Sequence, residues 1–183
     1  MPARSDVRYT YEDYLSIPEG TSERYEIVDG ELFVTPAPRF RHQQVVMNLA
    51  YLLSGLAREH GLGEVVGPLT VRLADDTVTE PDLVFLRSDR LGIIEQGRIH
   101  GTPDLVVEVL SPSNRDYDRT LKRRRYMASG LPELWILDAD EHTIEVWQPG
   151  AAEPETPRDV VTWRVGERTF DISLADIFRS SRT

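Results

Sequence analysis

The apolar and polar positions of the chain alternate between a spacing typical of strands and a spacing typical of helices. Short apolar runs and period-two alternation predict strands, whereas apolar residues three or four positions apart predict helices. Blocks of both kinds follow one another from residue 24 to the end of the chain. The pattern therefore predicts an α/β (α+β) fold, and we expect residues 1–183 to form a single domain around one core.

Two segments have helical spacing. Residues 41–60 carry apolar side chains at three- and four-residue intervals, and Gly61 closes this longest helix. A second helix is expected from about residue 115 to 129, with Gly130 at its end and Ser113 or Asn114 as its cap. Short helical turns are expected after Thr10, as far as Pro18, and over residues 174–178.

The other apolar blocks predict strands. Residues 83–86 and 105–110 are almost continuously apolar, which is typical of central strands covered on both faces. Asp29-Gly30 favours a tight hairpin turn between the first two strands. The strands are expected at 24–28, 31–34, 69–73, 83–86, 105–110, 134–137, 143–147, 160–165 and 169–172.

Composition narrows the candidate chemistry. The chain has no cysteine, so a metal would be bound by oxygen or imidazole, and Mg²⁺ is the leading candidate. The net charge of −10 argues against a broad basic surface for nucleic acid, although residues 36–132 are close to neutral. No apolar leader or membrane-spanning stretch is visible, so we expect a cytoplasmic protein without a membrane partner.

Two carboxylates are the first candidates for a functional site. Glu108 is a charge within an otherwise apolar strand, and a buried carboxylate is costly unless it is paired or metal-bound. Asp104 lies about 13 Å away along the same strand, too far to share one ion with it. Asp82 stands at the start of a different strand, so this distance does not exclude it from sharing an ion with Glu108. The alternative for Glu108 is a structural ion pair, and for Asp82 a loop cap.

Lys122 is the only lysine, in a chain with twenty arginines. An ammonium is a compact point charge, chemically distinct from a guanidinium, and can lie beside an attacking water or a developing phosphorane charge. The alternative is a solvated helix position, because Arg123, Arg124 and Arg125 follow directly. These arginines and Arg119 either contact backbone phosphates or form i,i+4 pairs with nearby acids.

Five segments follow one another in a recognisable order: 24–32 (RYEIVDGEL), 41–42 (RH), 81–84 (PDLV), 103–113 (PDLVVEVLSPS) and 126–138 (YMASGLPELWILD). Together they resemble the Uma2 family, which is grouped with the restriction-endonuclease-like, PD-(D/E)XK nucleases. The resemblance spans nearly the whole chain and implies a mixed central β-sheet flanked by helices, with a Mg²⁺-dependent phosphodiesterase-type site.

The resemblance also implies roles for single residues. Asp82 and Glu108 match the metal-binding acids of two core strands, and Mg²⁺ or Mn²⁺ is the implied cofactor. The superfamily's lysine position, two residues after the acid, is occupied here by Leu110, and Lys122 on the following helix matches the role instead. Glu26 matches an acid at the edge of the site. His42 matches a position near the start of the long helix, where its alternative is a cap or a packing residue.

Three functional hypotheses follow. The first is a metal-dependent endonuclease with nucleic acid, DNA before RNA, as its partner. The second is a nuclease-fold module that binds nucleic acid or protein without cutting. The third is a purely structural homo-oligomer, with its interface at Trp135, Trp147 and Trp163. Independently of its function, we expect the chain to form a homo-oligomer, most simply a dimer.

Overall fold

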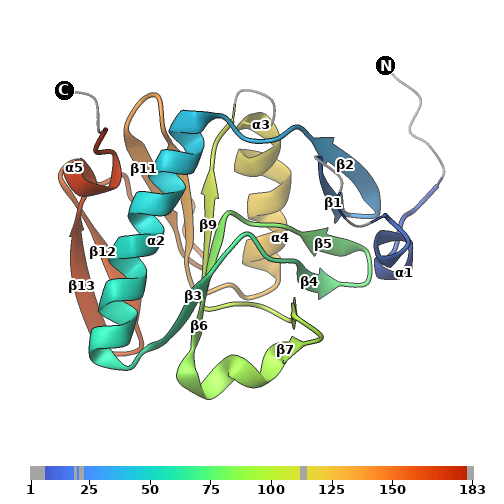
Figure 1. The fold of residues 1–183 in the computed structure, drawn as a ribbon, viewed down its shortest axis with the longest axis horizontal. Coiled ribbons are helices and arrows are strands. Elements are labelled where there is room, and N and C mark those ends of the chain that lie inside the picture. Colours follow the sequence, from blue (N-terminus) through green and yellow to red (C-terminus); the bar gives the residue numbers. More distant parts are fainter. Residues whose placement is uncertain (1–6, 19, 21–22, 112–114, 181–183) are drawn as a thin grey trace.

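The long helix and the two continuous apolar strands predicted from the sequence meet in the middle of the molecule (Figure 1). The structure, a computed structural model, describes residues 7–18, 20, 23–111 and 115–180. Its central sheet has five strands in the order β11 (Thr143–Trp147), β10 (Leu134–Asp138), β9 (Leu105–Val109), β6 (Leu83–Arg87) and β3 (Gly63–Val66).

The central sheet is mixed, as predicted. Strands β9 and β10 run parallel, whereas the pairs β10–β11, β6–β9 and β3–β6 are antiparallel. The parallel pair needs a crossover, and the helical segment between residues 115 and 128 provides it. This segment joins α3 (Arg115–Tyr117), a π-helical turn η2 (Asp118–Lys122) and α4 (Arg123–Ala128).

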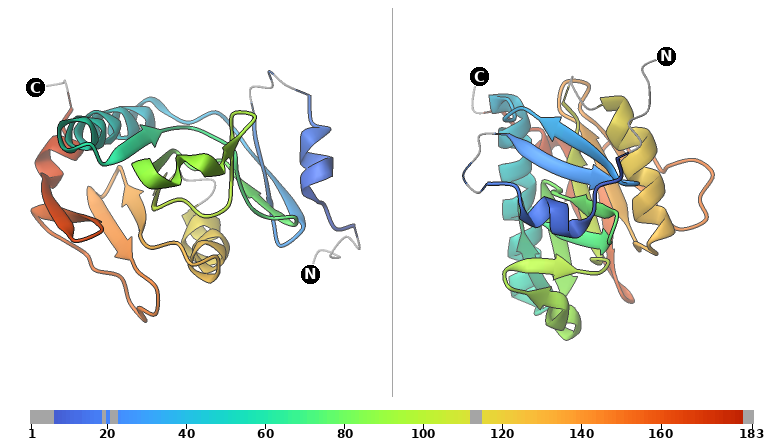
Figure 2. Two further views of the ribbon diagram at one scale, coloured as in Figure 1. Left: turned by 90° about the horizontal axis from the view of Figure 1, so that it is seen from below. Right: turned by 90° about the vertical axis from the view of Figure 1, so that its right-hand side faces the viewer.

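Helices cover both faces of the sheet (Figure 2). Helix α2 (Phe40–His60) packs Val45, Leu49 and Leu53 against one face, which includes Phe85 and Val107. On the other face, Tyr126 of α4 packs among residues such as Val106 and Ile136. This explains the continuous apolar runs, because neither face of β6 and β9 meets water. No helix in the described part of the chain is long and apolar enough to cross a membrane.

A second sheet lies beside the first. Its six strands follow the order β2 (Glu31–Thr35), β1 (Arg24–Val28), β5 (Thr77–Thr79), β4 (Val71–Ala74), β8 (Arg98–His100) and β7 (Ile94–Glu95). At the β1–β2 turn, Asp29 and Gly30 both have positive φ, 54° and 71°, as the predicted Asp-Gly hairpin turn requires. The other elements are α1 (Tyr11–Leu15), η1 (Ser88–Ile93), β12 (Val160–Val165), β13 (Arg168–Ser173) and α5 (Leu174–Ile177).

Most predicted elements are present, and the differences have simple causes. Thr10 caps α1 through a reciprocal bond with Asp13, and Gly61 ends α2 in the left-handed conformation. Strands β3, β5, β7 and β8 were missed because they have two to four residues and little apolar alternation. The strand predicted at 69–73 is β4, at Val71–Ala74. The predicted caps Ser113 and Asn114 lie outside the described residues.

The three tryptophans do not form an exposed patch, so that part of the oligomer hypothesis is wrong. Trp135 and Trp163 are fully buried, and Trp147 is nearly so. Trp163 packs edge-on against Phe85 in the core beneath α2. The indoles therefore serve the fold of one chain, and a contact between copies would need a different surface.

Candidate functional site

Asp82 and Glu108 lie on neighbouring strands of the central sheet. Strands β6 and β9 pair antiparallel with Leu83 opposite Val107, so one further step places Asp82 opposite Glu108. Residues directly opposite each other in an antiparallel pair point to the same face. Glu108 points toward α4, as its bond with Tyr126 demonstrates. The backbone of Gly67 packs so closely against Asp82 that a Cβ there would lie 2.1 Å from the Asp82 carbonyl oxygen.

The first cluster of the site surrounds Asp82. Arg24 of β1 donates to Oδ1 at 2.9 Å, His42 of α2 lies with Nε2 3.1 Å from Oδ2, and the Val109 N–H donates to Oδ2 at 2.8 Å. His42 is buried and pairs with Asp82, and α2 has no side-chain cap bond at its start, so the cap alternative is wrong. Burial alone would raise the pKa of Asp82, but the bond from His42 and the charges of His42 and Arg24 outweigh burial and lower it.

The second cluster surrounds Lys122. Its Nζ lies 2.7 Å from Glu108 Oε1, 2.8 Å from Glu26 Oε1 and 3.4 Å from Asp118 Oδ1. The side chain of Lys122 is buried, so the solvated alternative is wrong. Two further bonds fix the carboxylates, because Tyr126 Oη donates to Glu108 at 2.8 Å and the Glu80 N–H donates to Glu26 at 2.8 Å.

Helical spacing explains how one short segment supplies three members of this cluster. Asp118, Lys122 and Tyr126 are four residues apart, so they project from one face of the helix. The π-helical turn η2 covers Asp118 and Lys122, and such turns frequently occur at functional sites. The ring of Tyr117 lies over Lys122, 5.9 Å from Nζ, and stacks on Phe33 of β2.

The Lys122 cluster carries more negative than positive charge. Burial raises the pKa of Glu108 to about 8 and that of Asp118 to about 6, with Lys122 opposing both shifts and the neighbouring carboxylates adding to them. Burial acts to lower the pKa of Lys122, but Glu108, Glu26 and Asp118 outweigh it and raise it well above its usual value. The pKa values of the two acids and of the lysine are all raised, because three carboxylates share one ammonium.

The oxygen donors and the surplus of negative charge are of the kind that a hard cation prefers. Both carboxylate oxygens of Asp118 are buried without a hydrogen-bond partner, and the cation near them is the Lys122 ammonium, 3.4 Å from Oδ1. Oxygen donors are those that Mg²⁺ and Mn²⁺ prefer. Within the described ranges, however, no three acidic or histidine side chains are grouped closely enough to surround one ion, and the Lys122 ammonium lies between three of the carboxylates.

The arginines of the same helix lie on its outer side. Arg124 and Arg125 pair with Asp29, Arg125 also with Asp76, and Arg119 with Glu145. These partners come from distant strands and turns, so the predicted i,i+4 pairing is wrong. Arg123 differs, because its guanidinium stacks 4.1 Å above the Trp147 ring.

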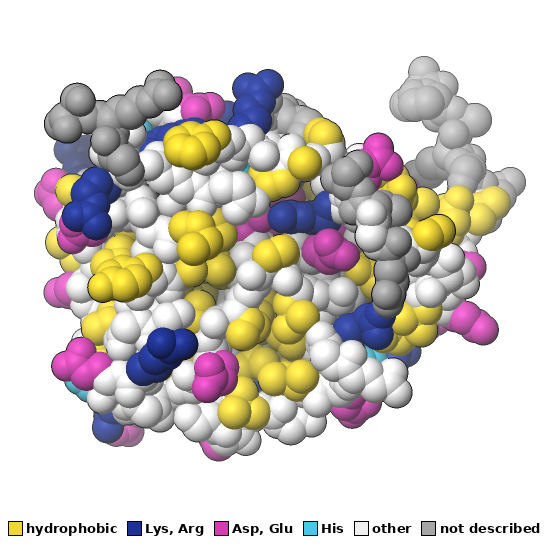
Figure 3. Space-filling view, in the orientation of Figure 1, with side chains coloured by type: hydrophobic (Ala, Val, Ile, Leu, Met, Phe, Trp, Pro, Cys, Tyr) yellow, Lys and Arg dark blue, Asp and Glu magenta, His cyan; other side chains and the backbone are white. Residues whose placement is uncertain are grey.

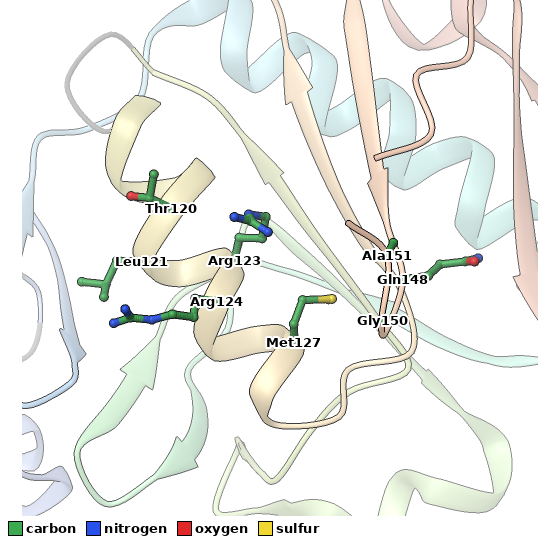
Figure 4. Close-up of a pocket in the computed structure, with 8 residues that line it drawn as sticks. All are labelled: Thr120, Leu121, Arg123, Arg124, Met127, Gln148, Gly150 and Ala151. Carbon is green, nitrogen blue, oxygen red and sulfur yellow. The ribbon is translucent and has the colours of Figure 1, made fainter. Parts of the chain in front are cut away.

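A pocket of about 440 Å³ lies on this outer side (Figure 4). Arg123, Arg124 and Met127 of α4 form one wall, and the loop residues Gly150 and Ala151 form the other. No side chain of either charged cluster lines this pocket. Arg123 and Arg124, which line the pocket, therefore lie on another side of the helix from the buried Lys122.

The structure brings together all five residues singled out from the sequence. Glu26, Glu108 and Lys122 share one cluster, and His42 contacts Asp82 in the other. Sequence reasoning missed Arg24, Asp118 and Tyr126. The four-residue spacing from Lys122 indicated the last two in principle, whereas the contact between Arg24 and Asp82 joins residues 58 positions apart.

Comparisons with known proteins agree with this architecture. The sequence model of the Uma2 family, described as "Putative restriction endonuclease", matches residues 11–175. A crystal structure of a putative nuclease belonging to DUF820 from Anabaena variabilis superimposes with a TM-score of 0.78 at 24% identity, covering 92% of this chain and 97% of that one. That likeness demonstrates the fold, which is restriction-endonuclease-like. No curated protein matches the chain.

Proposed function

Because this chain belongs to the Uma2 family, we propose that it is a metal-dependent endonuclease that hydrolyses phosphodiester bonds of nucleic acid, DNA before RNA. One observation carries the proposal. A buried ammonium contacts two carboxylates from separate strands, Glu26 and Glu108, and Glu108 lies opposite a third carboxylate, Asp82. Acids beside one lysine are the groups that phosphodiester hydrolysis needs.

Asp82 and Glu108 would hold the ion, which is Mg²⁺ or Mn²⁺ in this proposal. When bound, such an ion polarises the phosphate and lowers the pKa of a bound water. Arg24 and His42 orient Asp82, and Tyr126 orients Glu108. Lys122 supplies positive charge where negative charge develops on the phosphate oxygens. Arg24 is the most exposed charged group of the two clusters, at 19%, so the substrate approaches from its side.

The test is cleavage of supercoiled plasmid, single-stranded DNA and RNA with Mg²⁺, with Mn²⁺ and with a chelator. We expect metal-dependent cleavage that falls by at least about a hundredfold in Glu108→Gln and Lys122→Met. Arg124→Met is the matched control, because it removes a charge from the same helix on the outer side. Cleavage that persists in Glu108→Gln, or that ignores the chelator, would contradict the proposal.

A second candidate function is a nuclease-fold module that binds nucleic acid or protein without cutting. Two observations favour it. Arg24, His42 and the Val109 N–H engage both oxygens of Asp82, and no three acidic or histidine groups in the described residues surround one point closely enough for an ion. Calorimetry with Mn²⁺ separates the candidates, since the binding module requires no metal uptake and the nuclease does.

A further inference from the structure

We propose that the outward face of α2 is a self-complementary interface through which two copies of this chain pair antiparallel. The proposal does not depend on the nuclease function, because α2 presents this face away from both charged clusters. It replaces the tryptophan surface that the buried indoles exclude.

Three large apolar side chains lie on this face without cover. Phe40 is 81% exposed, Met47 65% and Tyr51 79%, and these are the three most exposed large hydrophobic residues of the described chain. Apolar side chains lie along the part of the surface that α2 occupies (Figure 3). An exposed apolar stripe on one helix usually marks a contact with another protein.

Charge argues that the partner is a second copy. The chain carries a net charge of −10, so two copies repel each other over most of their surfaces. The exposed positions of α2 from Phe40 to Gly55 carry no charge at all, being Phe40, Gln43, Met47, Tyr51 and Gly55. This stretch of α2 therefore brings no pair of like charges together when two copies meet on it.

The stripe has the spacing of a helix–helix seam. Phe40, Met47 and Ser54 are seven residues apart, and so are Gln44, Tyr51 and Arg58. Seven-residue intervals keep one face of a helix toward a partner helix over its length. The seam from residue 40 to 58 is about 27 Å long at 1.5 Å per residue.

The seam complements itself when the second helix runs in the opposite direction. An antiparallel pair centred on position 49 places Met47 against Tyr51 of the other copy, and Phe40 against Arg58. The first contact is a thioether on an aromatic ring, and the second is a guanidinium on an aromatic ring. Gln43 faces Gly55, where the space beside the backbone is open. In a parallel pair each residue would instead face the same residue of the other copy, for example Met47 against Met47.

One pair of helices makes a small interface, so the dimer is expected to dissociate on dilution. Sedimentation equilibrium over about a hundredfold range of concentration tests this. We expect the average mass of the wild-type protein to rise above the 20.9 kDa of one chain as concentration increases. Met47→Glu and Tyr51→Glu are expected to remain at the monomer mass, because each places a carboxylate in the seam.

Val160→Glu is the matched control, since Val160 is 44% exposed on β12, outside the proposed α2 seam, and the substitution adds the same charge. It is expected to associate like the wild type. Far-UV circular dichroism and the melting temperature verify that all three variants fold. A wild-type protein that stays monomeric throughout, or a Tyr51→Glu variant that associates like the control, would overturn the proposal.

The orientation has its own test, which the absence of native cysteine makes clean. Met47→Cys and Tyr51→Cys are prepared separately, then oxidised alone and as a mixture. Antiparallel pairing predicts that the mixed disulfide, between position 47 of one chain and position 51 of the other, forms faster than either homotypic disulfide. Faster homotypic cross-linking would indicate parallel helices and would overturn the proposed arrangement.

Discussion

Asp82 and Glu108 lie opposite each other at neighbouring strands, yet the two clusters to which they belong stabilise a buried charge in opposite ways. Asp82 is one carboxylate with an arginine, a histidine and a backbone N–H around it, and its pKa is lowered. Lys122 is one ammonium among three carboxylates, and the pKa values of Glu108 and Asp118 are raised.

The two clusters therefore differ in how readily each would accept another cation. Around Asp82 the negative charge is already offset, so the carboxylate is held in one ionised, oriented state. Around Lys122 the carboxylates outnumber the cation, and the raised pKa of Glu108, about 8, keeps a proton there at neutral pH that offsets part of the surplus. In the proposed function a cation held by Asp82 and Glu108 would replace that proton, so we expect metal uptake to be linked to proton release at Glu108.

The largest expected effect comes from removing the ammonium. Lys122→Met leaves three buried carboxylates without their shared cation, and breaking buried pairs of this kind costs about 3–5 kcal/mol. We expect the free energy of unfolding at pH 7, from urea titration in chelator, to fall by that amount. The control Arg124→Met changes a largely exposed residue and should cost less than about 0.5 kcal/mol. A similar loss in both variants would contradict the assignment.

A second prediction uses pH to separate the clusters. The folded pKa of Glu108, about 8, exceeds the ordinary value of 4.5, so the folded state binds its proton more tightly than the unfolded state. Stability contributed by the protonated form is therefore lost as pH rises from 4.5 to 8. Relative to Glu108→Gln, the wild type should lose on the order of 3 kcal/mol of unfolding free energy between about pH 5 and pH 8.

Asp82→Asn supplies the contrast for the pH experiment. Because the pKa of Asp82 lies below its ordinary value of 3.8, the stability that Asp82 contributes is present above that pH and is lost as pH falls through the folded pKa. The two variants should thus differ from the wild type with opposite pH trends. Parallel trends, measured by urea titration in the same buffers, would show that the clusters are not electrostatically distinct.

The smallest expected effect concerns Asp118, whose carboxylate oxygens have no hydrogen-bond partner. Asp118→Asn keeps the shape and removes one charge from the surplus. We expect this variant to be more stable than the wild type at pH 8 by about 1 kcal/mol. The gain should disappear near pH 4, where the wild-type carboxyl, with a pKa of about 6, is already protonated. Destabilisation at pH 8, seen as a lower melting temperature, would argue that Lys122 requires Asp118.

The central strands, the long helix α2, the helical segment 115–128 and the residues with candidate chemistry were predictable from the amino-acid sequence. Strands β6 and β9 were predictable because twofold coverage makes them continuously apolar, and α2 because its buried side chains repeat at helical spacing. Lys122 was predictable as a candidate because it is the only lysine. These features depend on local spacing or on composition, so they can be predicted without the tertiary structure.

The grouping of these candidate residues, in contrast, depends on contacts between distant elements. Glu26 and Lys122 come from elements nearly a hundred residues apart, and Arg24 reaches Asp82 across two sheets. The side to which Lys122 points depends on how its helix is rotated relative to β9. A rotation by one residue separates the buried Lys122 from Arg123, which lines the pocket on the outer side. The spacing of residues along the chain does not predict this rotation. It follows from packing Tyr126 and Leu131 against the sheet, which turns one face of the helix inward and with it the single ammonium.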